Sequence, residues 1–178
     1  FDAFTYKNLS SKTVIKLYED RKKRIWILTR PDGIYQFHKN QFSYYTTENN
    51  LLDNIVWSIN EDTEGNIWLG TFGGISKISK KPFEIYTTDF GIPDKDIGAV
   101  HADKSGNIWA GGYNGLFRLD LDNNISIFNV ENGMPSNRIE CITHDINNNI
   151  WIGTLFVLTK YSGNKFTTYE DYIWFDQM

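Results

Sequence analysis

Apolar and polar positions recur along this chain with a period of about 42 residues. Trp26, Trp68, Trp109 and Trp151 are separated by 42, 41 and 42 residues, and apolar residues stand twelve and nine positions before each of them. An aspartate stands six positions before each tryptophan, and an aromatic pair follows in three of the four units. Self-similarity at a fixed period of this size indicates an array of one supersecondary unit.

Each unit predicts four short strands, which we call a to d in chain order. In the second unit we place them at about Val56–Asn60, Asn66–Thr71, Ile75–Ser79 and Phe83–Thr87. These segments are rich in β-branched and aromatic residues and are bounded by Gly, Asn, Asp and Pro, which is typical of strands. The connection that begins at Asp62 is a turn, because an aspartate can bind its own backbone two residues further on. No stretch has a sustained helical period.

Repeated four-stranded sheets of about 40–45 residues are the blades of a β-propeller. The sequence therefore predicts an all-β fold, a single β-propeller region over residues 1–178 with about four antiparallel blades. We divide it into an orphan outer strand at 1–6 and blades at 14–54, 55–96, 97–138 and 139–178, the last including a tail.

The ends of the array suggest part of a larger propeller. The first unit is preceded by what looks like an outer strand alone, and no new strand a follows Tyr169. Two alternatives stay open: a four-bladed ring closed by the N-terminal strand, and an assembly completed by a second chain. The chain begins at Phe1 without a signal-peptide pattern, so we expect a processed or excised piece.

The composition of the chain argues against two classes of partner, nucleic acids and membranes. The net charge is −4, which gives no reason to expect nucleic acid or an anionic membrane. No apolar run reaches the roughly 20 residues that span a bilayer, so we expect no direct membrane contact by this segment. Cys141 is the only cysteine, which excludes an internal disulfide, and its place in an apolar strand predicts a small buried thiol.

The unit I-x-x-I-x-x-D-x-x-G-N-I-W-x-G-T-x-x-G, followed by an aromatic pair and a G-I-P or G-M-P loop, closely resembles the two-component regulator propeller repeat. The resemblance covers about Val14 to Tyr169 and is strongest in the second and third units. The first unit departs from the pattern at Arg21-Lys22-Lys23-Arg24, where Gly-Asn is expected, and the fourth at Phe156-Val157, where a glycine pair is expected.

The resemblance implies a function as well as a fold. This repeat builds the periplasmic sensor region of hybrid two-component systems, especially in gut Bacteroides-type bacteria. It therefore implies a ligand-sensing ectodomain of an inner-membrane protein, with a small-molecule or oligosaccharide ligand, because many members sense glycan breakdown products. Histidine kinase activity would belong to the parent chain, and no cofactor is implied.

Residues that recur once per unit are expected to serve the fold. The four periodic tryptophans are predicted to pack between blades, and Asp62, Asp103 and Asp145 to cap turns. Trp57 and Trp174 fall outside the period and are freer to be functional, although core filling remains the simpler assignment for them.

No catalytic or metal-binding constellation is visible in the sequence. His101 stands eight positions before its tryptophan and His144 seven before its own. On strands these positions point to opposite faces, so we expect no ring of histidines. The chain is therefore predicted to bind without catalysis and not to be an enzyme.

Loop residues that differ between blades are the best candidates for ligand binding, because the repeat does not require them. In a propeller the b–c turns and the loops from strand d to the next strand a meet on one face, around the channel mouth. Their aromatic, basic and amide side chains suit a hydroxyl-rich ligand, although ordinary solvated loops would look the same. The predicted ligand-binding residues are Arg30, Asp32, Phe72, Lys95, Tyr113, Asn114, Asn137 and Arg138.

Two other functions compete with ligand sensing. The chain could be a structural or dimerisation scaffold whose partners are other blades or a second copy. It could also be an enzyme, because metal-dependent lyase propellers that open cyclic peptides carry similar G-N-I-W blades. The placement of the histidines counts against the lyase.

Overall fold

Sixteen strands form four sheets in the computed structural model, which describes residues 12–79 and 83–169. Within each sheet four consecutive strands pair antiparallel in chain order, so each sheet is a meander built from one sequence unit. The prediction of an all-β fold with four antiparallel blades is confirmed. Residues 1–6, Trp174 and the rest of the tail lie outside the described residues.

The first two sheets contain β1 (Thr13–Glu19), β2 (Ile25–Arg30), β3 (Ile34–His38) and β4 (Gln41–Tyr45), then β5 (Val56–Glu61), β6 (Ile67–Thr71), β7 (Gly74–Ile78) and β8 (Glu84–Tyr86). The last two contain β9 (Ala99–Ala102), β10 (Ile108–Gly111), β11 (Leu116–Leu119) and β12 (Ile125–Phe128), then β13 (Ile139–His144), β14 (Ile150–Thr154), β15 (Leu158–Ser162) and β16 (Lys165–Tyr169).

Three 3-10 turns, which the sequence pattern does not predict, lie in the connections between sheets at Thr47–Asn49, Thr88–Phe90 and Val130–Asn132. The side chains of Thr46 and Asn129 accept hydrogen bonds from the backbone N–H groups of Glu48 and Glu131, the second residues of two of these turns. Each turn ends at a residue with a positive φ. One turn of helix is too short to produce a hydrophobic period, so only its caps mark it in the sequence.

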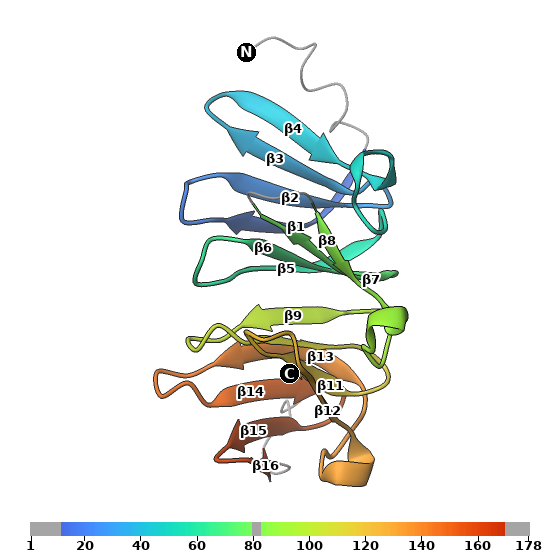
Figure 1. Cartoon of the computed structure of the whole chain (residues 1–178). Helices are drawn as coiled ribbons and strands as arrows, with labels where there is room; N and C mark the ends of the chain where they lie inside the picture. Colours follow the sequence, from blue (N-terminus) through green and yellow to red (C-terminus); the bar gives the residue numbers. More distant parts are fainter. Residues whose placement is uncertain (1–11, 80–82, 170–178) are drawn as a thin grey trace, which may run out of the picture.

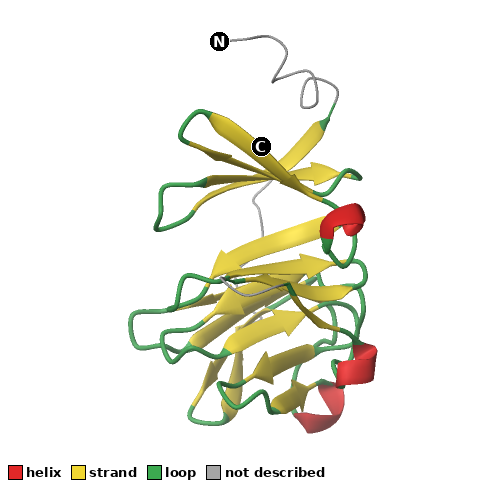
Figure 2. Cartoon of the chain, turned by 45° about the horizontal axis from the view of Figure 1, so that its top comes forward, coloured by secondary structure: helices red, strands yellow, loops and turns green. Residues whose placement is uncertain are grey.

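The turns and loops gather on two opposite sides of the stacked sheets (Figures 1 and 2). The side with the three 3-10 turns carries the b–c turns and the connections between sheets, and we call it the loop face. The other side carries the a–b and c–d turns, and we call it the turn face. The inner strands β1, β5, β9 and β13 contact their neighbours along the stack.

Three of the four periodic tryptophans pack against the next sheet, as predicted. Trp26 joins a cluster with Val56 and Leu69, Trp68 one with Ile97 and Ile108, and Trp109 one with Ile139 and Ile152. Trp26, Trp68 and Trp109 are at most 4% exposed. Trp151 is only half-buried, because no further sheet packs on it within the described residues.

An aspartate holds each tryptophan. The carboxylates of Asp20, Asp62, Asp103 and Asp145 accept hydrogen bonds from the indole Nε1 of the tryptophan six residues later, at 2.8, 2.7, 2.9 and 3.1 Å. Each also accepts two backbone N–H groups of its own turn, as Asp103 does from Ser105 and Asn107. The predicted turn-capping role is confirmed, and the bond to the indole is an addition that the sequence reading missed.

Hydrogen bonding lowers the pKa of two of these carboxylates, Asp20 and Asp145. Burial acts to raise the pKa of Asp20, but the hydrogen bonds from Trp26 and Arg24 outweigh it, and the pKa is lowered. In the fourth blade the side chain of Asn149 is the main cause of a lowered pKa for Asp145. The charged form accepts several donors at once, which is the form that a folded blade requires.

The first and fourth sheets lie at opposite ends of the stack (Figure 1), so the described residues form an open arc and not a closed ring of four blades. Residues at the same repeat position differ in exposure between an inner blade and an end blade. Nine positions before the tryptophan, Ile59 of the second blade is 2% exposed, whereas Leu17 of the first blade is 64% exposed. At the other end Cys141 is exposed, whereas Ala99 at the same position of the third blade is buried. The prediction of a buried thiol is therefore wrong, because nothing among the described residues covers that face.

The aspartate–tryptophan bond predicts a large difference between two aspartates that make similar turns. Replacing Asp103 by Ala leaves the buried Trp109 N–H and two backbone N–H groups without their acceptor, and should lower the free energy of unfolding by about 2–4 kcal/mol. Asp120 accepts the same kind of backbone bonds, from Asp122 and Asn124, but no indole, so Asp120→Ala is the matched control. Urea unfolding followed by fluorescence measures both, and equal losses would contradict the role of the indole bond.

Candidate ligand-binding site

A cavity of about 260 Å³ opens on the loop face where the second, third and fourth sheets meet. It is lined by Trp57, Asp96, Gly98, Gly112, Tyr113, Arg138, Ile139 and Glu140. We call it the Trp57 cavity. Its size is close to the lower end of the range of small-molecule sites.

The cavity exists because one position of the repeat carries a different residue in each blade. Trp57, Gly98 and Glu140 all stand eleven positions before the tryptophan of their blade, at the start of the inner strand. The missing side chain of Gly98 leaves the space between the other two. A Cβ atom placed there would come no closer than 3.7 Å to a neighbour, the backbone oxygen of Ile139, so a side chain at this position would enter the cavity without a clash at its root.

The lining combines charge with a buried, unpaired donor. The indole Nε1 of Trp57 is buried and forms no hydrogen bond of normal geometry within the described residues. Burial is the main cause of a raised pKa for Asp96; the nearby indole N–H opposes the rise, and Asp94 and Asp53 add to it. Arg138 Nε is paired with Glu140 Oε1 at 2.6 Å. The indole N–H lies near the Asp96 carboxylate but makes no bond of normal geometry to it, so a ligand acceptor could pair with this donor.

Five of the eight predicted residues form cation–π pairs on the loop face. Arg30 lies over Trp57 at 4.0 Å from the ring centroid, Lys95 over Phe72 at 5.5 Å, and Arg138 over Tyr113 at 5.2 Å. Arg138 and Tyr113 line the Trp57 cavity themselves, whereas Arg30 only covers the ring of Trp57 and does not line it. These contacts orient long side chains that would otherwise move freely in solvent.

The other three predicted residues hold loops in place. Asp32 is paired with Lys12 at 2.8 Å, and the backbone N–H of Asn114 donates to Asp94. Asn137 accepts from the Val130 N–H through its side chain, and Asn54 makes the equivalent bond to Thr47. Asn137 is therefore a repeat position after all, and a role for these three in ligand binding stays a prediction.

The sequence reading did not select Gly98 or Glu140. Both could have been found by asking which positions vary between blades on strands and not only in loops. Trp57 was noted as falling outside the tryptophan period, and it is the residue around which the cavity forms.

His101 and His144 contact each other, which the prediction of no ring of histidines did not anticipate. His101 Nε2 and His144 Nδ1 are 2.7 Å apart, and Asn60 Nδ2 lies 3.5 Å from the other ring nitrogen of His101. The two histidines do point to opposite faces of their own sheets, since His101 pairs with Trp109 and His144 with Ile150. The face of the third sheet that carries Trp109 packs on the face of the fourth sheet that carries Ile150. His101 lies on the first of these faces and His144 on the second, so the packing brings the two histidines together.

The histidine pair makes stability depend on pH. Burial, helped by His144 and opposed by Asp103, lowers the pKa of His101 to about 4. The folded chain therefore holds this imidazole neutral, and the unfolded chain protonates it below its ordinary pKa of about 6.5. The free energy of unfolding is unaffected by this group near neutral pH and falls as the pH drops below that value towards 4.

Comparing the wild type with His101→Gln isolates this contribution. Glutamine keeps a side-chain amide for His144 but does not titrate. Between pH 7 and pH 5 the wild type should lose on the order of 1–2 kcal/mol more stability than the variant, measured by urea unfolding at each pH. Parallel pH profiles for the two proteins would contradict a neutral, buried His101.

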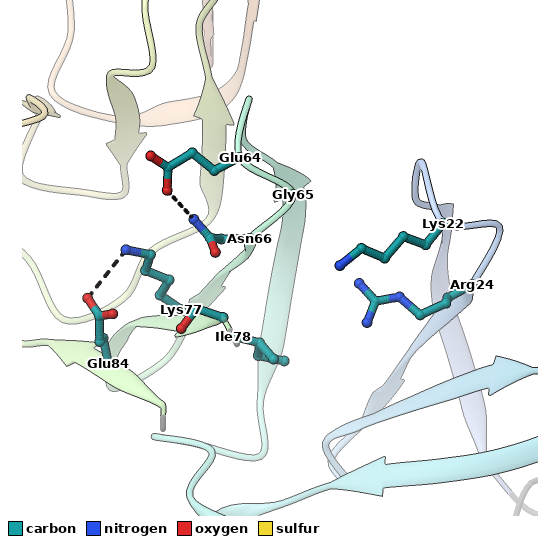
Figure 3. A pocket seen from close by; sticks show the side chains of 9 residues that line it. Lys22, Arg24, Glu64, Gly65, Asn66, Lys77, Ile78 and Glu84 are labelled. Atoms are coloured by element: carbon teal, nitrogen blue, oxygen red, sulfur yellow. Dashed lines mark hydrogen bonds and ion pairs between the residues drawn. The ribbon is translucent and has the colours of Figure 1, made fainter. Parts of the chain in front are cut away.

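A second and larger cavity, of about 460 Å³, lies on the turn face between the first and second sheets (Figure 3). The sequence reading did not predict it. Over the described ranges, no group of three or more His, Cys, Asp or Glu is placed to hold a metal ion. The helices that the structure describes are too short to cross a membrane.

Comparisons with known proteins match two parts of the chain to a family of repeats. A family model described as two component regulator propeller matches residues 50–73 and 133–156. The structure is similar to the extracellular domain of the hybrid two component system BT3049 from B. thetaiotaomicron, with a TM-score of 0.79 and 29% identity. The match covers 89% of this chain and 23% of that domain. No curated protein sequence matches the chain significantly.

Two further structures share the fold. The extracellular domain of the one component system BT4673 from B. thetaiotaomicron has a TM-score of 0.73 at 20% identity, over 88% of this chain and 24% of that one. Virginiamycin B lyase from Staphylococcus aureus has a TM-score of 0.71 at 17% identity, over 90% of this chain and 59% of the lyase. At these identities the similarity shows the propeller fold alone.

Proposed function

This chain carries two component regulator propeller repeats, and from that premise we propose that it is an extracytoplasmic ligand-sensing propeller of a hybrid two-component system. It binds its ligand without converting it. The 29% identity to an extracellular domain of such a system supports the proposal. Since the chain spans about a quarter of that domain, histidine kinase activity and membrane anchoring belong to other parts of the parent protein.

The Trp57 cavity is the observation that carries the proposal. It combines two aromatic residues, Trp57 and Tyr113, with the carboxylates of Asp96 and Glu140 and an unpaired indole N–H. Carboxylates accept hydrogen bonds from hydroxyl groups, the indole donates to a hydroxyl oxygen, and aromatic rings pack on the apolar faces of sugar rings. The lining therefore suits a small polyhydroxylated ligand, such as an oligosaccharide.

Binding at this place would couple neighbouring blades. Trp57 belongs to the second blade, Gly98 and Tyr113 to the third, and Glu140 to the fourth. A ligand that contacts all three favours one arrangement of the blades over others, and so shifts an equilibrium that already exists in the free protein. The shift would be passed to the parts of the parent protein that lie nearer the membrane.

Filling the cavity tests the proposal. Gly98→Leu adds a side chain into the space, and Gly98→Ala is the control because it adds only a Cβ that meets no atom closer than 3.7 Å. Calorimetry with a panel of neutral and acidic oligosaccharides should find a ligand whose affinity falls by about tenfold or more in Gly98→Leu, or ~1.4 kcal/mol. In Gly98→Ala the affinity should stay within about twofold. Unchanged binding in Gly98→Leu would place the ligand elsewhere.

A second candidate function, an association scaffold, is favoured by the uncovered end faces. Leu17 and Tyr44 on the first sheet are 64% and 57% exposed, and Leu158 and Tyr169 on the fourth are 38% and 45% exposed. The fully buried Ile75 and Leu116 occupy the position of Leu158 in the inner blades. Further blades of the parent protein or a second copy of this chain would cover such faces as the inner blades cover one another. If the chain associates through these faces and no ligand binds, the scaffold is the better assignment.

A further inference from the structure

The a–b turn of the first blade departs from the repeat. In the second and third blades the residues after the capping aspartate end in Gly-Asn, and in the fourth in Asn-Asn, whereas the first blade has Arg21-Lys22-Lys23-Arg24. The turn has the same backbone shape as the others. Lys23 has a positive φ of 63°, and Gly65 and Gly106, which stand at the same position of the next two blades, have a φ of 85°. A lysine tolerates this left-handed conformation less well than glycine does. The conformation of the turn therefore does not explain why a lysine stands at this position.

Three of these four basic side chains have partners. Arg21 is paired with Glu61 and donates to the Thr63 carbonyl, Lys23 is paired with Glu19, and Arg24 with the capping Asp20. The ammonium group of Lys22 makes no ion pair or hydrogen bond within residues 12–79 and 83–169. Figure 3 shows Lys22 and Arg24 pointing from the first blade into the cavity of about 460 Å³, towards the second blade.

The opposite wall supplies hydrogen-bond acceptors. Glu84 accepts from Lys77 at 3.3 Å and from the Tyr86 hydroxyl at 3.1 Å, and Glu64 accepts from Asn66 at 3.2 Å. Lys77 also lies over the Trp68 ring, 5.1 Å from its centroid. A carboxylate has about four acceptor sites, so both glutamates can accept further hydroxyl donors. One side of the cavity thus offers positive charge, and the other offers acceptors for hydroxyl groups (Figure 3).

We propose that this cavity is a binding site for a small acidic saccharide, whose carboxylate pairs with Lys22 beside Arg24 while its hydroxyl groups donate to Glu64 and Glu84. The volume is within the range of small-molecule sites and suits a ligand of about two sugar rings. The site is separate from the Trp57 cavity, which opens on the other face. It does not depend on the function proposed for that cavity.

The pairing chemistry favours a carboxylate over a neutral sugar. Among the residues that the structure describes, the Lys22 ammonium is the one basic group on this turn without an ion pair, and Arg24 adds a second donor at the same edge. An anion therefore gains a charge-assisted hydrogen bond without displacing an existing ion pair. Because the cavity opens to solvent, added salt screens the attraction and weakens binding.

A matched pair of disaccharides tests the site. Cellobiouronic acid and cellobiose differ by one carboxylate, and calorimetry at low salt should show the acid binding about tenfold or more tightly than the neutral sugar. Lys22→Gln should weaken binding of the acid by about fivefold or more. The control is Lys23→Gln, which removes the same charge from the same turn but does not line the cavity. It should change the affinity by less than about twofold.

Three results would overturn the proposal: equal affinity for the two sugars, no binding of the acid, or equal losses in Lys22→Gln and Lys23→Gln. The last would mean attraction by the net charge of the turn and not by a site. Thermal unfolding of each variant checks that the blade is intact. Gly98→Leu must leave binding of cellobiouronic acid unchanged, so failure here and failure of the proposed function are distinguishable.

Discussion

The hydrogen bond from an indole N–H to the aspartate six residues before it is the interaction on which this structure depends. It occurs in all four described blades, with the aspartate at the end of the inner strand and the tryptophan on the second strand. The aspartate closes the turn and the tryptophan fills the space to the next sheet, so one bond joins the local fold of a blade to the packing between blades. A buried carboxylate is tolerated only because these donors surround it.

The two cavities lie where the sequence departs from this scheme. On the loop face, Gly98 takes a position that Trp57 and Glu140 hold in neighbouring blades, and the missing side chain opens a space. On the turn face, Lys22 and Arg24 stand in a turn that ends in Gly-Asn in the second and third blades. The periodic residues fix the backbone so firmly that single positions can change without loss of the blade. That freedom allows one scaffold to present different chemistry between successive blades.

The period explains why the fold could be predicted and much of the site could not. The strands of the second unit, the interblade packing of Trp68 and the capping by Asp62 follow from positions that repeat. The contact of His101 with His144 could not be seen from either strand alone, because it requires knowing that opposite faces of adjacent sheets meet. Gly98 has no side chain for a motif to select, and its importance comes from what surrounds it. Asn137 looks like a variable loop position in the sequence, although Asn54 makes the same bond in another blade.

The central claim is that residues 12–79 and 83–169 form an open arc of blades, and that no other described residue covers its two end faces. Small-angle X-ray scattering, combined with light scattering over a range of concentrations, tests it most directly. The account predicts that at low concentration the chain is a monomer whose scattering fits an elongated stack with the first and fourth sheets at opposite ends. It also predicts that the mass rises with concentration as the uncovered faces associate. A compact monomer at every concentration, with scattering that fits a closed ring in which the first and fourth sheets touch, would contradict the account.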